Sequence, residues 1–151
     1  MRLNIWISIL FVLWLPASFA DEAALRALVS NYIDTYAKRT DIDKLLSFYA
    51  DEFRFYDEKL NLELTNKQEL SAFFDWQNPH FKVMGDKSLR TSSIDVADNK
   101  VIVKGWFNPF KWGQKHYEQM PFTMTFTFDE HHLILSHTDN IDYPDSLLNP
   151  S

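Results

Sequence analysis

The feature that most constrains the fold is a segment near the C-terminus in which apolar and hydroxyl-bearing side chains alternate. Threonine occupies positions 123, 125 and 127, and the positions between and around them are apolar: Met120, Phe122, Met124, Phe126 and Phe128. A period of two is typical of a β-strand with one buried face and one solvated face. We expect this strand, within residues 117–128, to form a hairpin with residues 133–140, because only a short polar turn separates them.

The register expected for this hairpin turns two ionisable side chains toward the apolar face. We expect Phe128 to pair with Leu133. In that register His137 lies opposite Met124, and Asp139 follows on the same face two residues later. A shift of one residue would turn both leucines of the second strand outward, so we expect the histidine and the aspartate to point inward.

A third ionisable group is placed inward by the same parity. Phe53 and Phe55 commit one face of an earlier strand to the core, and Asp57 follows them on that face. Ionised groups in apolar surroundings are costly unless they are paired. Asp57, His137 and Asp139 in one aromatic interior therefore indicate a binding or catalytic cavity. The alternative is that His137 and Asp139 bond only to each other, as structural polar groups.

The remaining elements form a single domain in which helices precede a run of strands. Apolar residues spaced three and four apart predict a first helix. Thr40 and Asp41 predict the start of a second helix, and Thr65 with Gln68, or Asn66 with Glu69, the start of a third. The expected helices are 21–38, 42–49 and one ending at Phe74; the expected strands are 53–57, 60–64, 88–97, 100–107, 117–128 and 133–140, with 108–115 as a connection. This order predicts an α+β fold with helices on one face of a mainly antiparallel sheet.

The N-terminus has the pattern of a secretory signal peptide. Arg2 precedes an apolar run over residues 5–15, and small residues at Ser18 and Ala20 suit a signal peptidase. A membrane-spanning helix needs about 20 apolar residues, which is longer than this run. We expect residues 1–20 to be cleaved, residues 21–143 to form the domain, residues 144–151 to form a loose tail, and the protein to be periplasmic or secreted.

Composition excludes several classes of partner. The net charge of −6 becomes one unit more negative when Arg2 is removed with the signal peptide. An acidic chain lacks the basic surface that nucleic acids and anionic membranes require. The chain has no cysteine, which excludes disulfides and thiolate metal sites. Zinc needs three or four ligands, and His137 with Asp139 offers two, so we expect no metal and no cofactor.

Two segments resemble a known superfamily. Tyr32 to Asp57 (YIDTYAKRTDIDKLLSFYADEFRFYD) resembles the opening of nuclear transport factor 2-like proteins, which include ketosteroid isomerases, SnoaL-like polyketide cyclases and limonene epoxide hydrolases. The segment LILSHTDNIDYP is similar to the last strand of the cyclase branch, where a His-x-Asp pair is common. The resemblance spans nearly all of residues 23–143. It implies a cone-shaped fold, with a strongly curved sheet wrapped on N-terminal helices around a deep pocket.

The resemblance also implies roles for individual residues. Asp57 falls where the isomerases keep a proton-shuttling aspartate, but their oxyanion-donating tyrosine falls on Ile33. A steroid isomerase mechanism would therefore lack its main electrostatic contribution. His137 and Asp139 match the cyclase pattern, although Thr138 stands where an aromatic residue is usual, and Asp139 would be the acid–base group.

Three functions remain open at this point. The first is a carrier of a small hydrophobic or aromatic molecule, with Trp76, Trp106 and Trp112 near the pocket mouth. The second is an enzyme using Asp57, His137 and Asp139 for proton transfer. The third is a protein-interaction module or homodimer, common in this superfamily, with Phe107, Phe110, Met120, Trp106 and Trp112 at the interface. We expect the ligand to contact Tyr32, Tyr36, Phe55, Phe122, Met124, Phe126 and Trp106.

Overall fold

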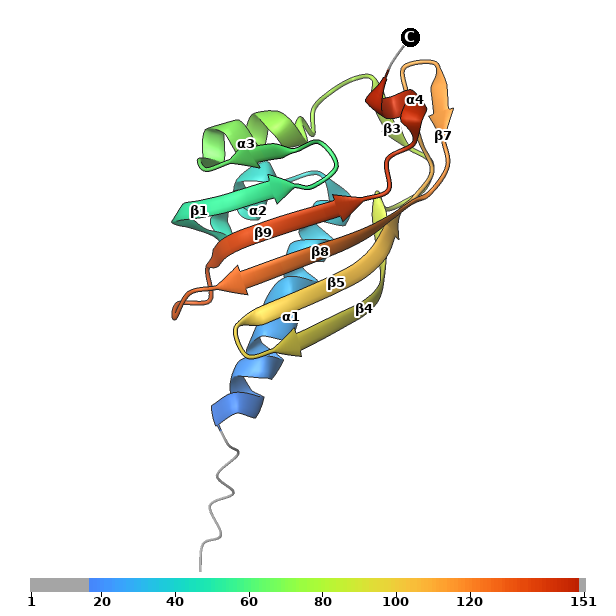
Figure 1. Cartoon of the computed structure of the whole chain (residues 1–151). Helices are drawn as coiled ribbons and strands as arrows, with labels where there is room; N and C mark the ends of the chain where they lie inside the picture. Colours follow the sequence, from blue (N-terminus) through green and yellow to red (C-terminus); the bar gives the residue numbers. More distant parts are fainter. Residues whose placement is uncertain (1–16, 150–151) are drawn as a thin grey trace, which may run out of the picture.

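The computed structural model describes residues 17–149, which form two sheets packed with helices (Figure 1). The larger sheet contains β1 (Tyr49–Asp57), β2 (Leu62–Leu64), β4 (Leu89–Ala97), β5 (Lys100–Phe107), β8 (Met120–Phe128) and β9 (Ile134–Ile141). Its strand order is β2-β1-β9-β8-β5-β4. Only the β1–β9 pair is parallel, and the other pairs are antiparallel. The expected α+β architecture is confirmed.

The helices lie on one side of this sheet and cover its apolar face (Figure 1). They are α1 (Ala17–Lys38), α2 (Ile42–Ser47) and α3 (Lys67–Phe74). The apolar stripe of α1 is buried, and this helix packs across β4 and β5. Asp41 caps α2 by accepting a hydrogen bond from the Lys44 amide, and Asn66 caps α3 through the Glu69 amide, so both predicted starts are confirmed.

A second, three-stranded sheet corrects the expected connection over residues 108–115. It contains β3 (Phe81–Val83), β6 (Phe110–Trp112) and β7 (Lys115–Tyr117), in the order β3-β6-β7. Each strand has three residues, too few for an alternation to be recognised in the sequence. This small sheet lies at the end of the molecule where the chain also finishes, beside α4 (Asp145–Leu148) (Figure 1).

The register of β8 and β9 differs from the expected one by a β-bulge. Phe126 pairs with His137 and Met124 with Asp139, whereas Phe128 pairs with Ile134. One extra residue, Leu135, therefore bulges outward and is 41% exposed. The expectation that Leu133 and Leu135 face inward is wrong, because Ile134 takes the buried position. After the bulge, the side chains of β9 again alternate so that His137 and Asp139 face the core.

The chain ends bear on two of the predictions. Residues 1–16 of the predicted signal peptide lie outside the described residues, and residues 17–20 form the first turn of α1. Across residues 17–149, no helix is long and apolar enough to cross a membrane. The segment predicted as a tail contains α4, whose Leu147 packs against the core.

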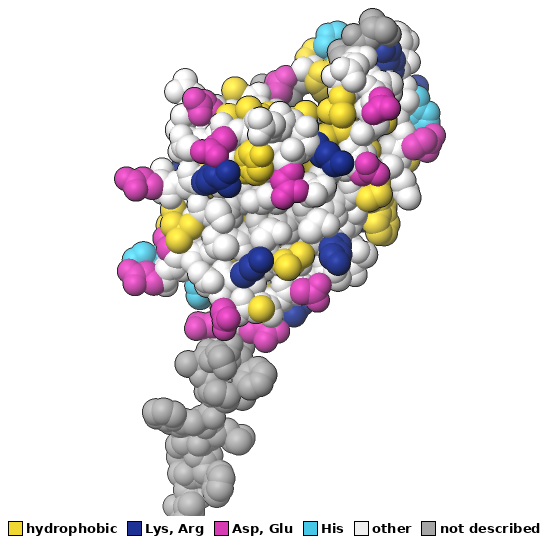
Figure 2. Space-filling view, viewed as in Figure 1, with side chains coloured by type: hydrophobic (Ala, Val, Ile, Leu, Met, Phe, Trp, Pro, Cys, Tyr) yellow, Lys and Arg dark blue, Asp and Glu magenta, His cyan; other side chains and the backbone are white. Residues whose placement is uncertain are grey.

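The two faces of the large sheet differ in chemistry. The inner face of β8 is buried and apolar, whereas Thr123, Thr125 and Thr127 on the outer face are partly exposed. Helices α1 to α3 do not cover this outer face, which is turned to the viewer in Figure 1. Figure 2 shows that its middle is largely free of charged side chains, which gather toward its margins.

Candidate functional site

The three ionisable residues predicted to face inward lie on adjacent strands. In the parallel β1–β9 pair, Asp57 is opposite Asp139 and Phe55 is opposite His137. Asp57 and His137 are 0% exposed and Asp139 is 1% exposed, so the predicted inward orientation is confirmed. Parallel pairing in register is what places the two carboxylates side by side, at the ends of their strands nearest the small sheet.

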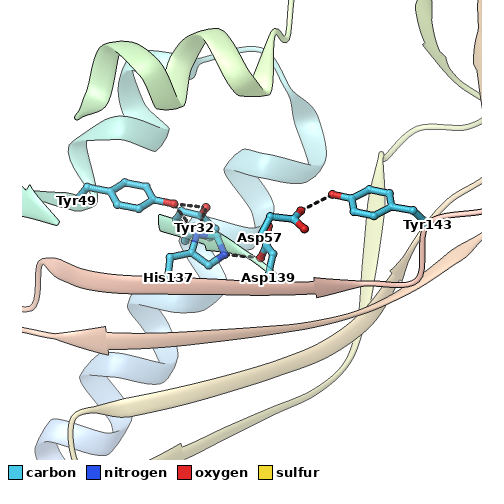
Figure 3. Close-up of polar contacts among 6 residues, drawn as sticks. All are labelled: Tyr32, Tyr49, Asp57, His137, Asp139 and Tyr143. Carbon is cyan, nitrogen blue, oxygen red and sulfur yellow. Dashed lines mark hydrogen bonds and ion pairs between the residues drawn. The ribbon is translucent and has the colours of Figure 1, made fainter. Parts of the chain in front are cut away.

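A chain of hydrogen bonds leads from the core to Asp139 (Figure 3). His137 Nε2 lies 2.6 Å from Asp139 Oδ1, and His137 Nδ1 lies 2.7 Å from the Tyr49 hydroxyl. The Tyr32 hydroxyl lies 2.8 Å from that of Tyr49. All four side chains are buried, so the chain is closed to solvent at its tyrosine end.

The direction of donation along this chain follows from the tyrosines. Burial raises the pKa of Tyr32 and of Tyr49, so both hydroxyls keep their protons. Tyr32 can then donate to Tyr49, and Tyr49 to Nδ1 of His137. The proton of the neutral imidazole is left on Nε2, where it donates to the Asp139 carboxylate. The network fixes the orientation of the Asp139 carboxylate.

Asp57 is held by a second, separate set of donors. The Tyr143 hydroxyl donates to Asp57 Oδ2 at 2.6 Å, and the Leu60 amide donates to Oδ1 at 3.0 Å (Figure 3). Burial raises the pKa of Asp57, an effect that the Tyr143 hydrogen bond opposes and the nearby Asp139 carboxylate reinforces. The pKa of Tyr143 is raised, chiefly by burial and also by Asp57. Burial therefore makes Asp57 easier to protonate than an ordinary aspartate.

A cavity of about 330 Å³ opens beside Asp139 and Tyr143. Its wall is largely aromatic and comes from α1, α3, the small sheet and the C-terminal segment. The aromatic lining residues are Tyr36, Phe73, Phe74, Phe81, Phe107, Phe110, Trp112 and Tyr143; the others are Arg39, Ala72, Asp75, Asn78, Ser88, Met120, Asp139, Ile141 and Leu147. This size and composition are typical of a site for a small organic molecule.

Two polar atoms in the cavity wall have no protein partner. Tyr36 is 6% exposed, and its hydroxyl makes no hydrogen bond to any residue in the described range 17–149. Asp139 uses Oδ1 for His137, and its Oδ2 has no donor in the same range. Burial raises the pKa of Tyr36, so it carries a proton to donate. The cavity thus offers one free donor and one free acceptor.

The residues predicted to contact a ligand divide into three groups. Tyr36 lines the cavity. Tyr32, Phe55, Phe122, Met124 and Phe126 are buried in the core behind it, and Phe126 stacks on the His137 ring with 4.4 Å between centroids. Trp106 lines a different, shallow depression of about 250 Å³ between α1 and β4. The prediction that Trp106 lines the pocket is therefore wrong, because on β5 it points away from the face that carries Phe107.

The two other tryptophans lie near the cavity, as predicted. Trp112 lines it and is 42% exposed, whereas Trp76 packs on Tyr36 with 5.7 Å between ring centroids. Phe107, Phe110 and Met120, expected in an intermolecular surface, are instead buried inside the domain. Sequence reasoning missed Arg39, Tyr49 and Tyr143, which carry no periodic signal strong enough to single them out. Within residues 17–149 no cluster of three His, Asp or Glu side chains could hold a metal ion.

Comparison with solved structures identifies the fold. A Shewanella putrefaciens CN-32 protein assigned as a SnoaL-like polyketide cyclase superposes with a TM-score of 0.66 at 19% identity, over 80% of this chain and 90% of that one. The chain has the nuclear transport factor 2-like fold. An LEH-like epoxide hydrolase from M. tuberculosis matches with a TM-score of 0.63 at 11% identity, over 81% and 85% of the two chains.

A third neighbour is a Burkholderia xenovorans LB400 NTF-2 like protein of unknown function, with a TM-score of 0.64 at 15% identity, over 82% and 86% of the two chains. No family model and no curated protein matches this chain. The resemblance inferred from Tyr32–Asp57 and from the His-x-Asp strand is confirmed at the level of the fold. One fold of this kind supports many chemistries, so function must be argued from the site.

Proposed function

We propose that this protein binds a small, ring-containing hydrophobic molecule in the cavity beside Asp139. The observation that carries the proposal is the pairing of a largely aromatic wall with two unpartnered polar atoms, Tyr36 Oη and Asp139 Oδ2. Both residues line the cavity, so a ligand inside it can hydrogen-bond to both atoms. The aromatic wall would contribute apolar contact, and the two polar atoms would fix the orientation of the ligand.

The size of the cavity limits the ligand. A volume of about 330 Å³ is near the lower end of the range for small-molecule sites. It favours a molecule of one or two rings that bears a hydroxyl or a similar donor for Asp139. A long lipid or a peptide does not match a cavity enclosed by α3, the small sheet and α4.

The test is isothermal titration calorimetry with 2-naphthol, whose fused rings suit the wall and whose hydroxyl can donate to Asp139. Ala72→Trp fills the cavity from an exposed position on α3. Ala27→Trp is the matched control, since it adds the same side chain at an exposed position on α1 away from the cavity. We expect saturable binding that Ala72→Trp abolishes and Ala27→Trp preserves. Equal binding by both variants, or none by the parent protein, would contradict the proposal.

A second candidate function, acid–base catalysis, is favoured by the hydrogen-bond chain behind Asp139. A binding site needs only the carboxylate. Here His137 also donates to Asp139, and the Tyr49 hydroxyl fixes the tautomer of His137. In this proposal Asp139 Oδ2 removes a proton from carbon next to a carbonyl group, the electron pair moves to the carbonyl oxygen, and Tyr36 Oη donates a hydrogen bond to that oxygen. Protonated Asp139 then returns a proton to the carbon.

Deuterium exchange into 2-tetralone, followed by NMR in D₂O, tests this second function. We expect the protein to accelerate exchange at the carbon between the ring and the carbonyl group, and Asp139→Asn to remove the acceleration. Asp75→Asn, at a lining carboxylate outside the hydrogen-bond chain, is the control. Exchange at the solvent rate with the parent protein would exclude catalysis and leave binding in place.

Two further proposals concern location and assembly. We propose that the chain is exported, on the strength of residues 1–20, and N-terminal sequencing of protein from its host should begin at Asp21. We also propose a homodimer formed through the outer sheet face rather than the aromatic residues first expected there. Its partly exposed, uncharged Thr123, Thr125 and Thr138 support this choice. Sedimentation of a monomer at micromolar concentration would contradict it.

A further inference from the structure

The mouth of the cavity contains an arginine without a carboxylate partner. Arg39 follows α1, lines the cavity and is partly buried. No carboxylate of residues 17–149 lies within ion-pair distance of it, although other arginines pair with Glu22, Glu63 and Asp86. Its one hydrogen bond goes to the Phe74 carbonyl at 3.4 Å. A guanidinium has five N–H donors, so most of its capacity is unused.

Aromatic rings hold this guanidinium in a fixed position. Its Cζ atom lies 4.1 Å from the centroid of Phe81 and 5.8 Å from that of Trp76. Stacking of this kind orients the planar group while leaving its edge available for hydrogen bonds. Burial lowers the pKa of Arg39, yet the group stays protonated because arginine starts from so high a value.

Two other unpaired donors lie next to Arg39. The indole Nε1 of Trp76 is buried and has no acceptor among the described residues. The Tyr36 ring packs on that indole, and Tyr36 and Arg39 both line the cavity. Tyr36 and Arg39 therefore place free donor capacity in the cavity wall, Trp76 adds an unpaired donor behind Tyr36, and the free carboxylate oxygen of Asp139 lies in the same wall.

We infer that the ligand is a small cyclic carboxylic acid, with its carboxylate on Arg39 and its ring against the aromatic wall. This inference rests on the proposed ligand-binding function and names the class of ligand. Carboxylate and guanidinium form paired, charge-assisted hydrogen bonds, which are stronger than neutral ones. Tyr36, Arg39 and Asp139 line the same cavity, so one small ligand can reach all three. The far end of the ligand carries a hydroxyl or an acidic C–H group facing Asp139.

The neighbouring acidic group does not remove this preference. Asp75 also lines the mouth, but its Oδ2 accepts a hydrogen bond from Asn78 Nδ2 at 2.6 Å. Asp75 opposes the lowering of the pKa of Arg39, but the two form no ion pair among the described residues, so the guanidinium keeps N–H donors for a ligand. A cationic ligand would instead have to approach Arg39, which is unfavourable by like-charge repulsion.

The test compares three probes of similar size by isothermal titration calorimetry: 4-hydroxyphenylacetate, its amide and tyramine. We expect the acid to bind the parent protein about tenfold or more tightly than the amide, and tyramine to bind most weakly. Arg39→Gln should lower the affinity of the acid far more than that of the amide, so that the acid loses its advantage. Arg54→Gln is the matched control, because Arg54 also stacks on an aromatic ring, Tyr56, at 4.7 Å, but lies away from the cavity.

The outcomes separate this inference from the proposed function. Equal binding of acid and amide, with both lost in Ala72→Trp, would overturn the carboxylic acid class and keep the binding site. Preference for tyramine would also overturn it, in favour of a cationic ligand. Absence of binding by all three probes and by 2-naphthol would overturn both proposals. Comparison of the probes on the parent protein keeps the test decisive even if Arg39→Gln loses stability.

Discussion

The aromatic interior has a closed half and an open half, built from the same kinds of side chain. In the closed half, around His137, the two tyrosine hydroxyls and both imidazole nitrogens have partners, and the side chains are buried. In the open half, around Tyr36, aromatic rings surround about 330 Å³ of space, and the hydroxyl has no partner. The closed half serves as core, whereas the open half has the features of a binding site.

Asp139 lies at the boundary between the halves, and this position explains how it can be both buried and available. One carboxylate oxygen belongs to the closed half through His137, and the other faces the open half. A carboxylate wholly inside the closed half would have no access to a ligand. One wholly in the open half would lack the neighbours that fix its orientation. Substitutions in the closed half should therefore lower mainly the stability of the fold, whereas substitutions in the open half should lower mainly the affinity for a ligand.

The largest expected difference concerns the aromatic rings themselves. Phe126 is fully buried and stacks on His137, so Phe126→Ala should lower the free energy of unfolding by about 3–5 kcal/mol. Trp112 lines the open half and is 42% exposed, so Trp112→Ala should cost less than about 1 kcal/mol. Urea denaturation measures both. Similar losses would mean that the open half is ordinary core.

The next difference concerns two buried tyrosine hydroxyls. Tyr49→Phe leaves His137 Nδ1 without its donor at 2.7 Å and should cost about 1–3 kcal/mol of unfolding free energy. Tyr36→Phe removes a hydroxyl that bonds to nothing in the described chain, so its stability should change by less than about 0.5 kcal/mol. Chemical denaturation of the pair decides the point, and a large loss in Tyr36→Phe would reveal a partner for that hydroxyl.

For ligand affinity the order of the same two variants should be reversed, with the larger loss in Tyr36→Phe. Tyr36→Phe removes a donor that faces the cavity, so the dissociation constant of 4-hydroxyphenylacetate should rise about fivefold. Tyr49→Phe lies in the closed half and should change it by less than about twofold. Calorimetric titration of each folded variant provides the values. The reverse order of effects would place the ligand elsewhere.

The smallest expected effect is a pH dependence arising from Asp57. Because its pKa is raised in the folded protein, the folded state binds more protons than the unfolded state between the ordinary carboxyl pKa and the raised value. The unfolding free energy of the parent protein should therefore fall as the pH rises through that window. Asp57→Asn cannot titrate and should lack this fall, so its stability relative to the parent should increase with pH. Parallel stability profiles from acid to neutral pH would contradict the raised pKa.

The sequence was sufficient for the fold and for the inner face of the sheet. The alternation over residues 120–128 and the parity of Phe53, Phe55 and Asp57 depend only on the period of a strand. The same rule, applied to β5, would have placed Trp106 on the outer face, because Val101, Val103 and Phe107 occupy the inner one.

Other features could not be predicted from a single sequence. The bulge at Leu135 lies in a run of three apolar residues, Leu133 to Leu135, where hydrophobicity cannot distinguish one register from another. Tyr49, Tyr143 and Arg39 reach the site from three separate segments, so their proximity is a product of tertiary structure. The cavity itself depends on the small sheet, whose three-residue strands are too short to recognise.

The most direct test of the binding site is a crystal structure of the protein soaked with 2-naphthol. We expect the naphthyl ring in the cavity between α3 and the small sheet, with its hydroxyl within hydrogen-bond distance of Asp139 Oδ2 or Tyr36 Oη. An empty cavity at a 2-naphthol concentration that saturates the calorimetric titration, or density only in the depression beside Trp106, would show that the aromatic space next to Asp139 is not a ligand site.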